Sequence, residues 1–202
     1  MRTPTKLRPR TKPPGERRDE LMNAALRLFL KQGVATTTIE QITSGAEVAK
    51  GTFYLYFSSK EDLLAALGDR FGKKLLEGIK AAIDKMPKND WKGKLSAWAR
   101  AAVTVYLDSI REHDVVFYGS RPAKREGLVD NIIVDHLFEL LEAGIAVGAW
   151  TVEEPRVTAV FLFTGLHGAV DASQTNGKRI NRTQLADIVE QLCLRSVGPT
   201  ID

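Results

Sequence analysis

Apolar residues recur at helical spacing along most of the 202-residue chain, and no segment shows convincing two-residue alternation of the kind found in half-buried strands. Glycine, proline or asparagine follows several of these periodic segments, as expected where helices end. We therefore predict an all-α protein. The predicted helices cover residues 16–32, 38–46, 49–57, 59–86, 90–110, 122–148, 155–173 and 182–197, with a short apolar piece at 115–118.

The predicted helix over residues 59–86 ends before Pro87 and would be roughly 40 Å long. That length exceeds what a three-helix domain needs, so the helix should continue into a second domain. Gly68, Gly72 and Gly78 interrupt it, which indicates either close packing against the first helix or pliability. We expect a basic arm at 1–15, a helical domain at 16–60 and a larger helical domain at 61–202.

Residues 36–60 fit two short helices set across a tight turn. Thr37 and Glu40 match a capping box, in which each side chain binds a free amide at the start of a helix. Phe53 and Phe57 lie four residues apart and should point into the core. The other polar, aromatic and small positions of the second helix should face outward or lie on its flanks, where they suit DNA: Lys50, Gly51, Thr52, Tyr54, Leu55 and Tyr56.

The segments T-x-x-x-I, A-x-V-x-K-G-T-F-Y-x-Y-F and S-K-E-D-L-L within residues 33–64 resemble the DNA-binding domain of TetR-family transcriptional regulators. The resemblance implies that the second helix of the motif enters the major groove of a palindromic, double-stranded operator. The DNA contacts that it implies come from Thr38, Lys50, Gly51, Thr52, Tyr54, Leu55, Tyr56 and Lys60.

Three positions depart from the family pattern. Glu47 stands where the turn usually has glycine, Ala49 where Ser or Thr commonly caps the recognition helix, and Leu55 where a polar side chain is frequent. A missing cap typically costs ~1 kcal/mol, which does not threaten the fold. Leu55 cannot hydrogen-bond a base edge, so any base that it reads should be a thymine, through the methyl group.

The resemblance also implies a repressor that a small-molecule effector, bound among the middle helices, releases from its operator. Aromatic and weakly charged side chains in this region suit an apolar or aromatic effector, although most of them also fit ordinary core positions. The candidate pocket residues are Trp98, Tyr106, Phe117, Arg121, Phe138, Phe161 and His167.

Members of this family commonly pair their last two helices with the same helices of a second subunit, which implies a homodimer. A ridge of small residues and an apolar stripe fit this role here, and the alternative is ordinary packing within one chain. The candidate interface residues are Thr164, Gly165, Gly168, Ala169, Ala172, Leu185, Ile188, Val189 and Leu192.

Basic residues are concentrated at the amino terminus, where seven Lys or Arg within the first 18 residues face only Glu16. This proline-broken arm either lies along DNA phosphates and the minor groove or is a solubilising tail. The single cysteine, Cys193, fits a reducing compartment. The amino terminus has no apolar segment of the kind found in secretory signals, so we expect a cytoplasmic protein that does not enter the membrane.

Motifs for cofactor or metal chemistry are missing from the sequence. His113, His136 and His167 show no metal-ligand spacing, and there is no Walker loop, dinucleotide fingerprint or serine-nucleophile elbow. We therefore expect neither a metal nor a cofactor and no enzymatic activity. Two alternatives stay open, which are an all-helical enzyme acting on a small molecule and an architectural DNA-binding protein without an effector.

Overall fold

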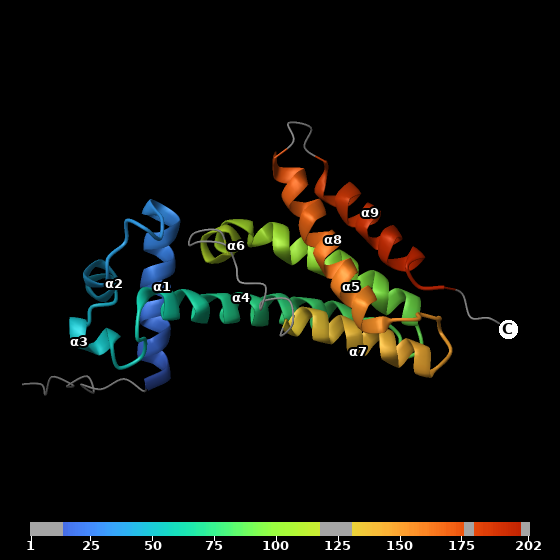
Figure 1. Cartoon of the computed structure of the whole chain (residues 1–202), viewed down its shortest axis with the longest axis horizontal. Helices are drawn as coiled ribbons and strands as arrows, with labels where there is room; N and C mark the ends of the chain where they lie inside the picture. The colour runs from blue at the N-terminus through green and yellow to red at the C-terminus, as the bar shows by residue number, and fades with distance from the viewer. Residues whose placement is uncertain (1–13, 118–130, 176–179, 199–202) are drawn as a thin grey trace, which may run out of the picture. The chain divides into compact units, whose positions relative to one another are not determined.

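The computed structural model describes residues 14–117, 131–175 and 180–198, and these are helical apart from connecting turns and one isolated bridge between Thr151 and Gly198 (Figure 1). The all-α prediction is confirmed. No helix in these ranges is long and apolar enough to cross a membrane. The helices are α1 (Pro14–Gln32), α2 (Ile39–Gly45), α3 (Lys50–Phe53), α4 (Lys60–Ile83), α5 (Trp91–Asp108), α6 (Ile110–Phe117), α7 (Ile132–Ala146), α8 (Pro155–Thr175) and α9 (Arg182–Arg195).

The chain divides into two compact units, Met1–Gly68 and Asp69–Asp202, and α4 runs from the first into the second. The division falls beyond the boundary expected at residue 60. Its position follows from burial, because the first two turns of α4 bury Leu63, Leu64 and Leu67, and these turns belong to the amino-terminal unit.

The amino-terminal unit is built from α1, α2, α3 and the start of α4. Helix α1 ends at Gly33, whose φ of 87° is a left-handed conformation that favours glycine. Helix α2 packs against α1, and α3 packs against α2. The core of the unit is apolar and includes Leu21, Met22, Ala25, Phe29, Ile42, Phe53 and Phe57, so the inward orientation predicted for the two phenylalanines is confirmed.

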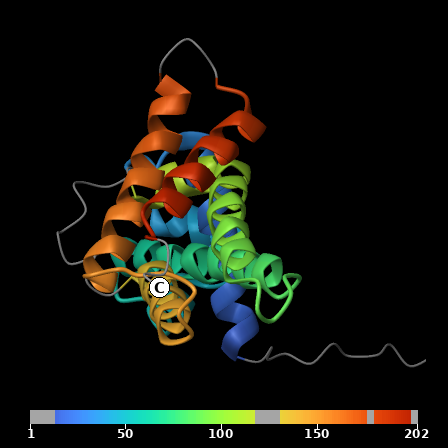
Figure 2. The same cartoon turned by 90° about the vertical axis from the view of Figure 1, so that its right-hand side faces the viewer.

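In the second unit, α5 lies along α9 and α7 packs against α8 (Figure 2). A Cβ atom at Gly78 of α4 would come within 2.8 Å of Val105 on α5, so this glycine allows close packing, although against α5 rather than the first helix. At Gly72 the nearest atom, from Ile132, would lie 3.5 Å away, which is an ordinary contact. Close packing therefore explains Gly78 but not Gly72.

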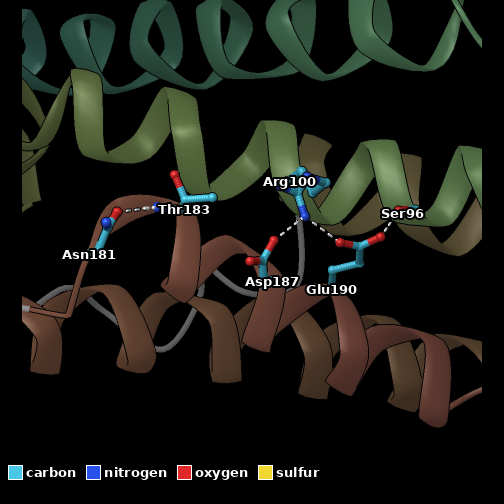
Figure 3. A network of polar contacts seen from close by, with 6 residues as sticks. All are labelled: Ser96, Arg100, Asn181, Thr183, Asp187 and Glu190. Atoms are coloured by element: carbon cyan, nitrogen blue, oxygen red, sulfur yellow. Dashed lines mark hydrogen bonds and ion pairs between the residues drawn. The ribbon is translucent and has the colours of Figure 1, made fainter.

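A polar network joins α5 to α9 (Figure 3). Arg100 of α5 donates to Asp187 at 2.5 Å and also to Glu190, and Ser96 donates to Glu190. Asn181 caps α9 by accepting from the amide of Thr183 at 2.9 Å. The network holds one face of α9 against α5, while Ile188 and Leu192 of α9 are exposed.

Some helix bounds differ from the sequence-based prediction. The helix predicted over residues 49–57 is α3, which ends at Phe53 and continues as a turn. The apolar piece at 115–118 is the end of α6, with Tyr118 outside the described residues. The predicted start of the helix over 122–148 also lies outside them, and its described part is α7.

Candidate functional sites

The start of α2 is fixed by a capping box that lies one residue later than predicted. The Thr38 hydroxyl accepts from the Gln41 amide at 3.2 Å, and the Gln41 side chain accepts from the Thr38 amide at 3.0 Å. The assignment of Thr37 and Glu40 was wrong because Thr37 is buried, where its hydroxyl donates to the Gly33 carbonyl at 2.7 Å. Glu40 is therefore not the capping-box partner, and its side chain is exposed.

The turn between α2 and α3 contains two of the three departures noted in the sequence. Glu47 has a φ of 55°, so a residue with a Cβ atom occupies the left-handed conformation that glycine adopts without strain. Ala49 caps α3 but makes no side-chain hydrogen bond to it. Both departures should lower the stability of the motif, through backbone strain at Glu47 and a missing cap at Ala49.

The candidate DNA-contacting residues of α3 and the following turn lie on an open surface. The side chain of Leu55 is 79% exposed and that of Tyr54 is 53% exposed, whereas Thr52 and Tyr56 are half-buried. No atom lies within 4 Å of the position that a Cβ would take at Gly51, so the backbone there is open to a close approach.

The two lysines of this surface are both engaged by groups of the protein. The ammonium of Lys60 donates to the carbonyls of Val34 at 2.7 Å and of Thr37 at 3.0 Å, which ties the α1–α2 connection to the start of α4. Lys50 forms an ion pair with Glu40 across α2 and α3. This pair lowers the pKa of Glu40 and raises that of Lys50, chiefly through the hydrogen bond between them.

A second candidate site is a polar cluster in the carboxy-terminal unit, formed by Tyr106 of α5 and His113 of α6, which are buried, and by His167 and Asp171 of α8, which are half-buried. The Tyr106 hydroxyl donates to Asp171 at 2.7 Å, so its oxygen can accept from the His113 ring, 3.1 Å away. The Nε2 atoms of His113 and His167 lie 3.2 Å apart. Three helices, α5, α6 and α8, therefore contribute side chains to one hydrogen-bonded cluster.

Burial lowers the pKa of both imidazoles of this cluster. The pKa of His167 falls to about 4, with proximity to His113 adding to the effect of burial, so both rings are neutral at neutral pH. Phe71, Phe117 and Phe163 pack against the two rings. The cluster thus offers neutral hydrogen-bonding groups between aromatic faces. Within the described residues, no group of three or more His, Cys, Asp and Glu side chains could hold a metal ion.

The structure brings together three of the predicted pocket residues, Tyr106, Phe117 and His167. Trp98 is fully buried in the core, and Phe138 lies half-buried beneath the Arg156 guanidinium. Arg121 lies outside the described residues. Phe161 was wrongly placed in the pocket, because its side chain is 71% exposed on the outer face of α8.

Sequence reasoning missed His113 and Asp171 as members of the cluster. The signal that was available is the spacing of His167 and Asp171, which lie four residues apart and therefore on one face of α8. The position of His113 on the separate helix α6 gives no such signal.

The predicted interface residues fall into two groups. On α8, Thr164, Gly165, Gly168 and Ala172 are exposed and Ala169 is half-buried, and on α9 Ile188 and Leu192 are exposed. Leu185 and Val189 are each only 3% exposed, because they pack into the core of their own unit. Assigning these two residues to an interface between subunits was therefore wrong.

The capped two-helix motif in the amino-terminal unit of an all-helical protein is typical of a helix-turn-helix regulator. Comparison with known proteins points to the same class. Residues 21–67 match the family described as "Bacterial regulatory proteins, tetR family". The HTH-type transcriptional regulator HbdR of Aromatoleum sp. (strain CIB) is 32% identical over 117 residues, covering 54% of this chain and 47% of HbdR. The chain spans less than half the length of the curated relatives that it matches.

Solved structures share the fold over nearly the full chain. FadR of Bacillus halodurans, a fatty acid degradation regulator, superposes with a TM-score of 0.69 and 24% identity, covering 92% of this chain and 97% of FadR. RolR, solved in complex with resorcinol, has a TM-score of 0.69 and 22% identity, covering 92% of this chain and 89% of RolR. Residues 21–67 thus match the tetR family of bacterial regulatory proteins, and the chain as a whole shares its fold with FadR and RolR.

Proposed function

We propose that the protein is a cytoplasmic repressor that binds a palindromic operator as a homodimer and leaves it when a small-molecule effector binds. The exposed surface of α3 and the following turn, with Gly51 open and Tyr54 and Leu55 facing outward, is the observation that carries the proposal. Such a surface suits the major groove, where base edges and the thymine methyl group are accessible. Thr38, Thr52, Tyr56 and the two lysines, Lys50 and Lys60, complete the proposed contacts.

The exposed faces of α8 and α9 support the dimer. Val157 and Phe161 are 63% and 71% exposed, and they continue the row of Thr164, Gly165 and Gly168 along one face of α8. A contiguous apolar row that its own chain leaves open is typical of an interaction surface. We propose that α8 and α9 of two copies pack together through this row and through Ile188 and Leu192 of α9.

The polar cluster supports an effector site in the second unit. Neutral imidazoles, a phenol and a carboxylate between aromatic rings suit an uncharged aromatic molecule that carries hydroxyl groups. RolR, which shares the fold, was solved with such a molecule, resorcinol. We propose that the effector binds at Tyr106, His113, His167 and Asp171, and that this chain performs no chemistry on it.

Selection of a duplex from random DNA tests the proposal, followed by titration of the protein with the selected duplex and a scrambled one. We expect the selected site to be palindromic and to bind at least 10³-fold more tightly than scrambled DNA. Replacing Thr52 with alanine should alter discrimination at one position per half-site by about 1 to 3 kcal/mol. Equal affinity for selected and bulk DNA would instead identify an architectural DNA-binding protein, and turnover of a bound ligand would identify an enzyme.

A further inference from the structure

The ion pair between Glu40 and Lys50 joins the first turn of α2 to the first residue of α3, across the helix-turn-helix. The side chains are 60% and 53% exposed, so the pair lies open to solvent rather than in the core. An exposed pair contributes little to folding stability. Any larger effect of the pair should therefore be on the binding of a charged ligand at this surface rather than on folding stability.

Lys50 is one of the residues that the proposed function places against DNA, where its ammonium would meet the phosphate backbone, and the inference rests on that proposal. A lysine strengthens DNA binding by neutralising a phosphate and releasing its condensed counterion. Lys50 can do so fully only after it leaves Glu40, and the Glu40 carboxylate then lies unpaired beside a phosphate. A glutamate of ordinary pKa is already charged at neutral pH, and the hydrogen bond from Lys50 lowers the pKa of Glu40 further, so the competing charge is present.

We propose that Glu40 is a restraint on DNA affinity, because its carboxylate competes with the phosphate backbone for the Lys50 ammonium. The restraint acts on every DNA sequence, since phosphate contacts carry no sequence information. It lowers the affinity for bulk DNA and reduces the dependence of binding on salt. Lys60, the other lysine of this surface, already donates to two backbone carbonyls, so Lys50 is well placed to determine this component of binding.

Removal of the Glu40 charge should strengthen binding to scrambled DNA. In Glu40→Gln we expect a gain of between about 1.4- and 5-fold per recognition helix, the range that corresponds to an exposed ion pair. The slope of log K against log salt concentration should steepen by up to about 0.9 per helix, because Lys50 then neutralises a phosphate without giving up a partner. Glu40→Ala should change binding in the same direction.

Glu47→Gln is the matched control, because Glu47 is also exposed and lies three residues before Lys50, but makes no ion pair with it. The four proteins to compare with the wild type are Glu40→Gln, Glu47→Gln, Lys50→Gln and the double variant Glu40→Gln/Lys50→Gln. Their affinities for scrambled and operator duplexes are measured by fluorescence anisotropy over a salt series, after thermal unfolding confirms that each variant folds.

The proposal requires that Glu40→Gln strengthens binding more than Glu47→Gln does, and that this excess disappears in the double variant when it is compared with Lys50→Gln. An equal gain from Glu40→Gln with lysine or with glutamine at position 50 would show general charge repulsion and overturn the proposal. So would weaker binding by Glu40→Gln, which would mean that Glu40 positions Lys50 for DNA. If the wild type prefers its operator while Glu40→Gln matches the control, only the restraint fails. If no protein of the set binds DNA, the proposed function fails as well.

Discussion

Glu47 is the residue at which the helix-turn-helix departs most clearly from unstrained geometry, with a φ of 55°. A residue with a Cβ atom pays roughly 1–2 kcal/mol in this conformation, and glycine does not. We expect Glu47→Gly to raise the free energy of unfolding by about 1 kcal/mol, because the greater freedom of glycine in the unfolded chain offsets part of the gain. Urea denaturation measures the change. Glu47→Ala keeps the Cβ atom, and an equal gain in this control would show that strain is not the cause.

His167 links the stability of the second unit to pH. Its pKa is about 4 in the folded protein and about 6.5 when it is unfolded, so the unfolded state binds more protons between these values. The free energy of unfolding should therefore be undiminished above about pH 6.5 and fall by roughly 3 kcal/mol as the pH drops to about 4. Burial also lowers the pKa of His113, so its protonation adds to the loss of stability at low pH. The charge of Asp171 raises the pKa of both histidines and so reduces that loss.

Chemical denaturation at several pH values between about 7 and 4 tests this dependence. His167→Asn should reduce the slope of stability against pH, because the group that titrates is gone while a smaller, hydrogen-bonding side chain that stays neutral is kept. An unchanged slope in His167→Asn would assign the pH dependence to other groups.

Individual residues were predictable from the sequence where one local rule decides their position. The inward orientation of Phe53 and Phe57 follows from their spacing alone. The position of the capping box could not be predicted in this way, because Thr37 and Thr38 both satisfy the pattern. Burial of Thr37 against the end of α1 selects Thr38. Such a choice depends on tertiary contacts that a local pattern does not contain.

The packing of helix α7 depends on Gly144, a glycine that the sequence analysis did not single out. A Cβ atom at Gly144 would come within 2.1 Å of the Trp150 ring, whose Nε1 donates to the Leu141 carbonyl near the end of α7 at 2.9 Å. Gly144→Ala should therefore destabilise the protein by about 1–3 kcal/mol through overpacking. Gly72→Ala is the control, since its Cβ would make only an ordinary contact and alanine favours a helix. Equal stability of the two variants in thermal unfolding would contradict the packing argument.

Helix α8 should carry the dimer interface on its exposed row. Gly168→Glu places a charge where two copies of this helix would meet, so we expect loss of the dimer together with loss of operator binding, since each recognition helix covers only a half-site. Sedimentation and DNA titration measure both. Ala81→Glu adds the same charge at an exposed position of α4 and should change neither. A folded Gly168→Glu dimer with normal operator affinity would place the interface elsewhere.

Helical periodicity predicted the existence and order of most helices, but not which of their faces meet. The row expected on the surface of α8 is exposed or half-buried, whereas Leu185 and Val189 of α9, which were expected at the same surface, lie in the core. Ile188 and Leu192 share that helix and are exposed. Periodicity locates an apolar stripe, whereas the packing of Leu185 and Val189 into the core, beside the ion pairs of Arg100 with Asp187 and Glu190, shows which side of α9 faces its own chain.

At the scale of the whole molecule, one continuous helix, α4, runs from the amino-terminal unit, which carries the helix-turn-helix, into the carboxy-terminal unit. The two-domain, all-helical organisation was predictable because a helix of that length and a recognisable motif are both local features. Convergence of Tyr106, His113, His167 and Asp171 was not, since these residues come from three helices and from positions up to 65 residues apart. The site that is proposed to receive the effector is thus the part that needed the structure.

Coupling between effector and operator is the prediction that tests this organisation. Two half-sites one helical turn apart require roughly 34–36 Å between recognition helices, so an effector-induced displacement of α4 by a few ångströms at each end should prevent simultaneous docking. The coupling free energy is typically about 1–3 kcal/mol and must be reciprocal, so operator DNA should weaken effector binding by the same factor, roughly 5- to 150-fold.

Thermal-shift screening of hydroxylated aromatics, beginning with resorcinol, identifies a ligand, and calorimetric titration with and without operator measures the coupling. Tyr106→Phe is the control, because it removes the hydroxyl that donates to Asp171 and should weaken the ligand while leaving operator affinity intact. A ligand that binds tightly but with the same affinity in the presence of operator would contradict the mechanism, because equal binding to both states shifts no equilibrium.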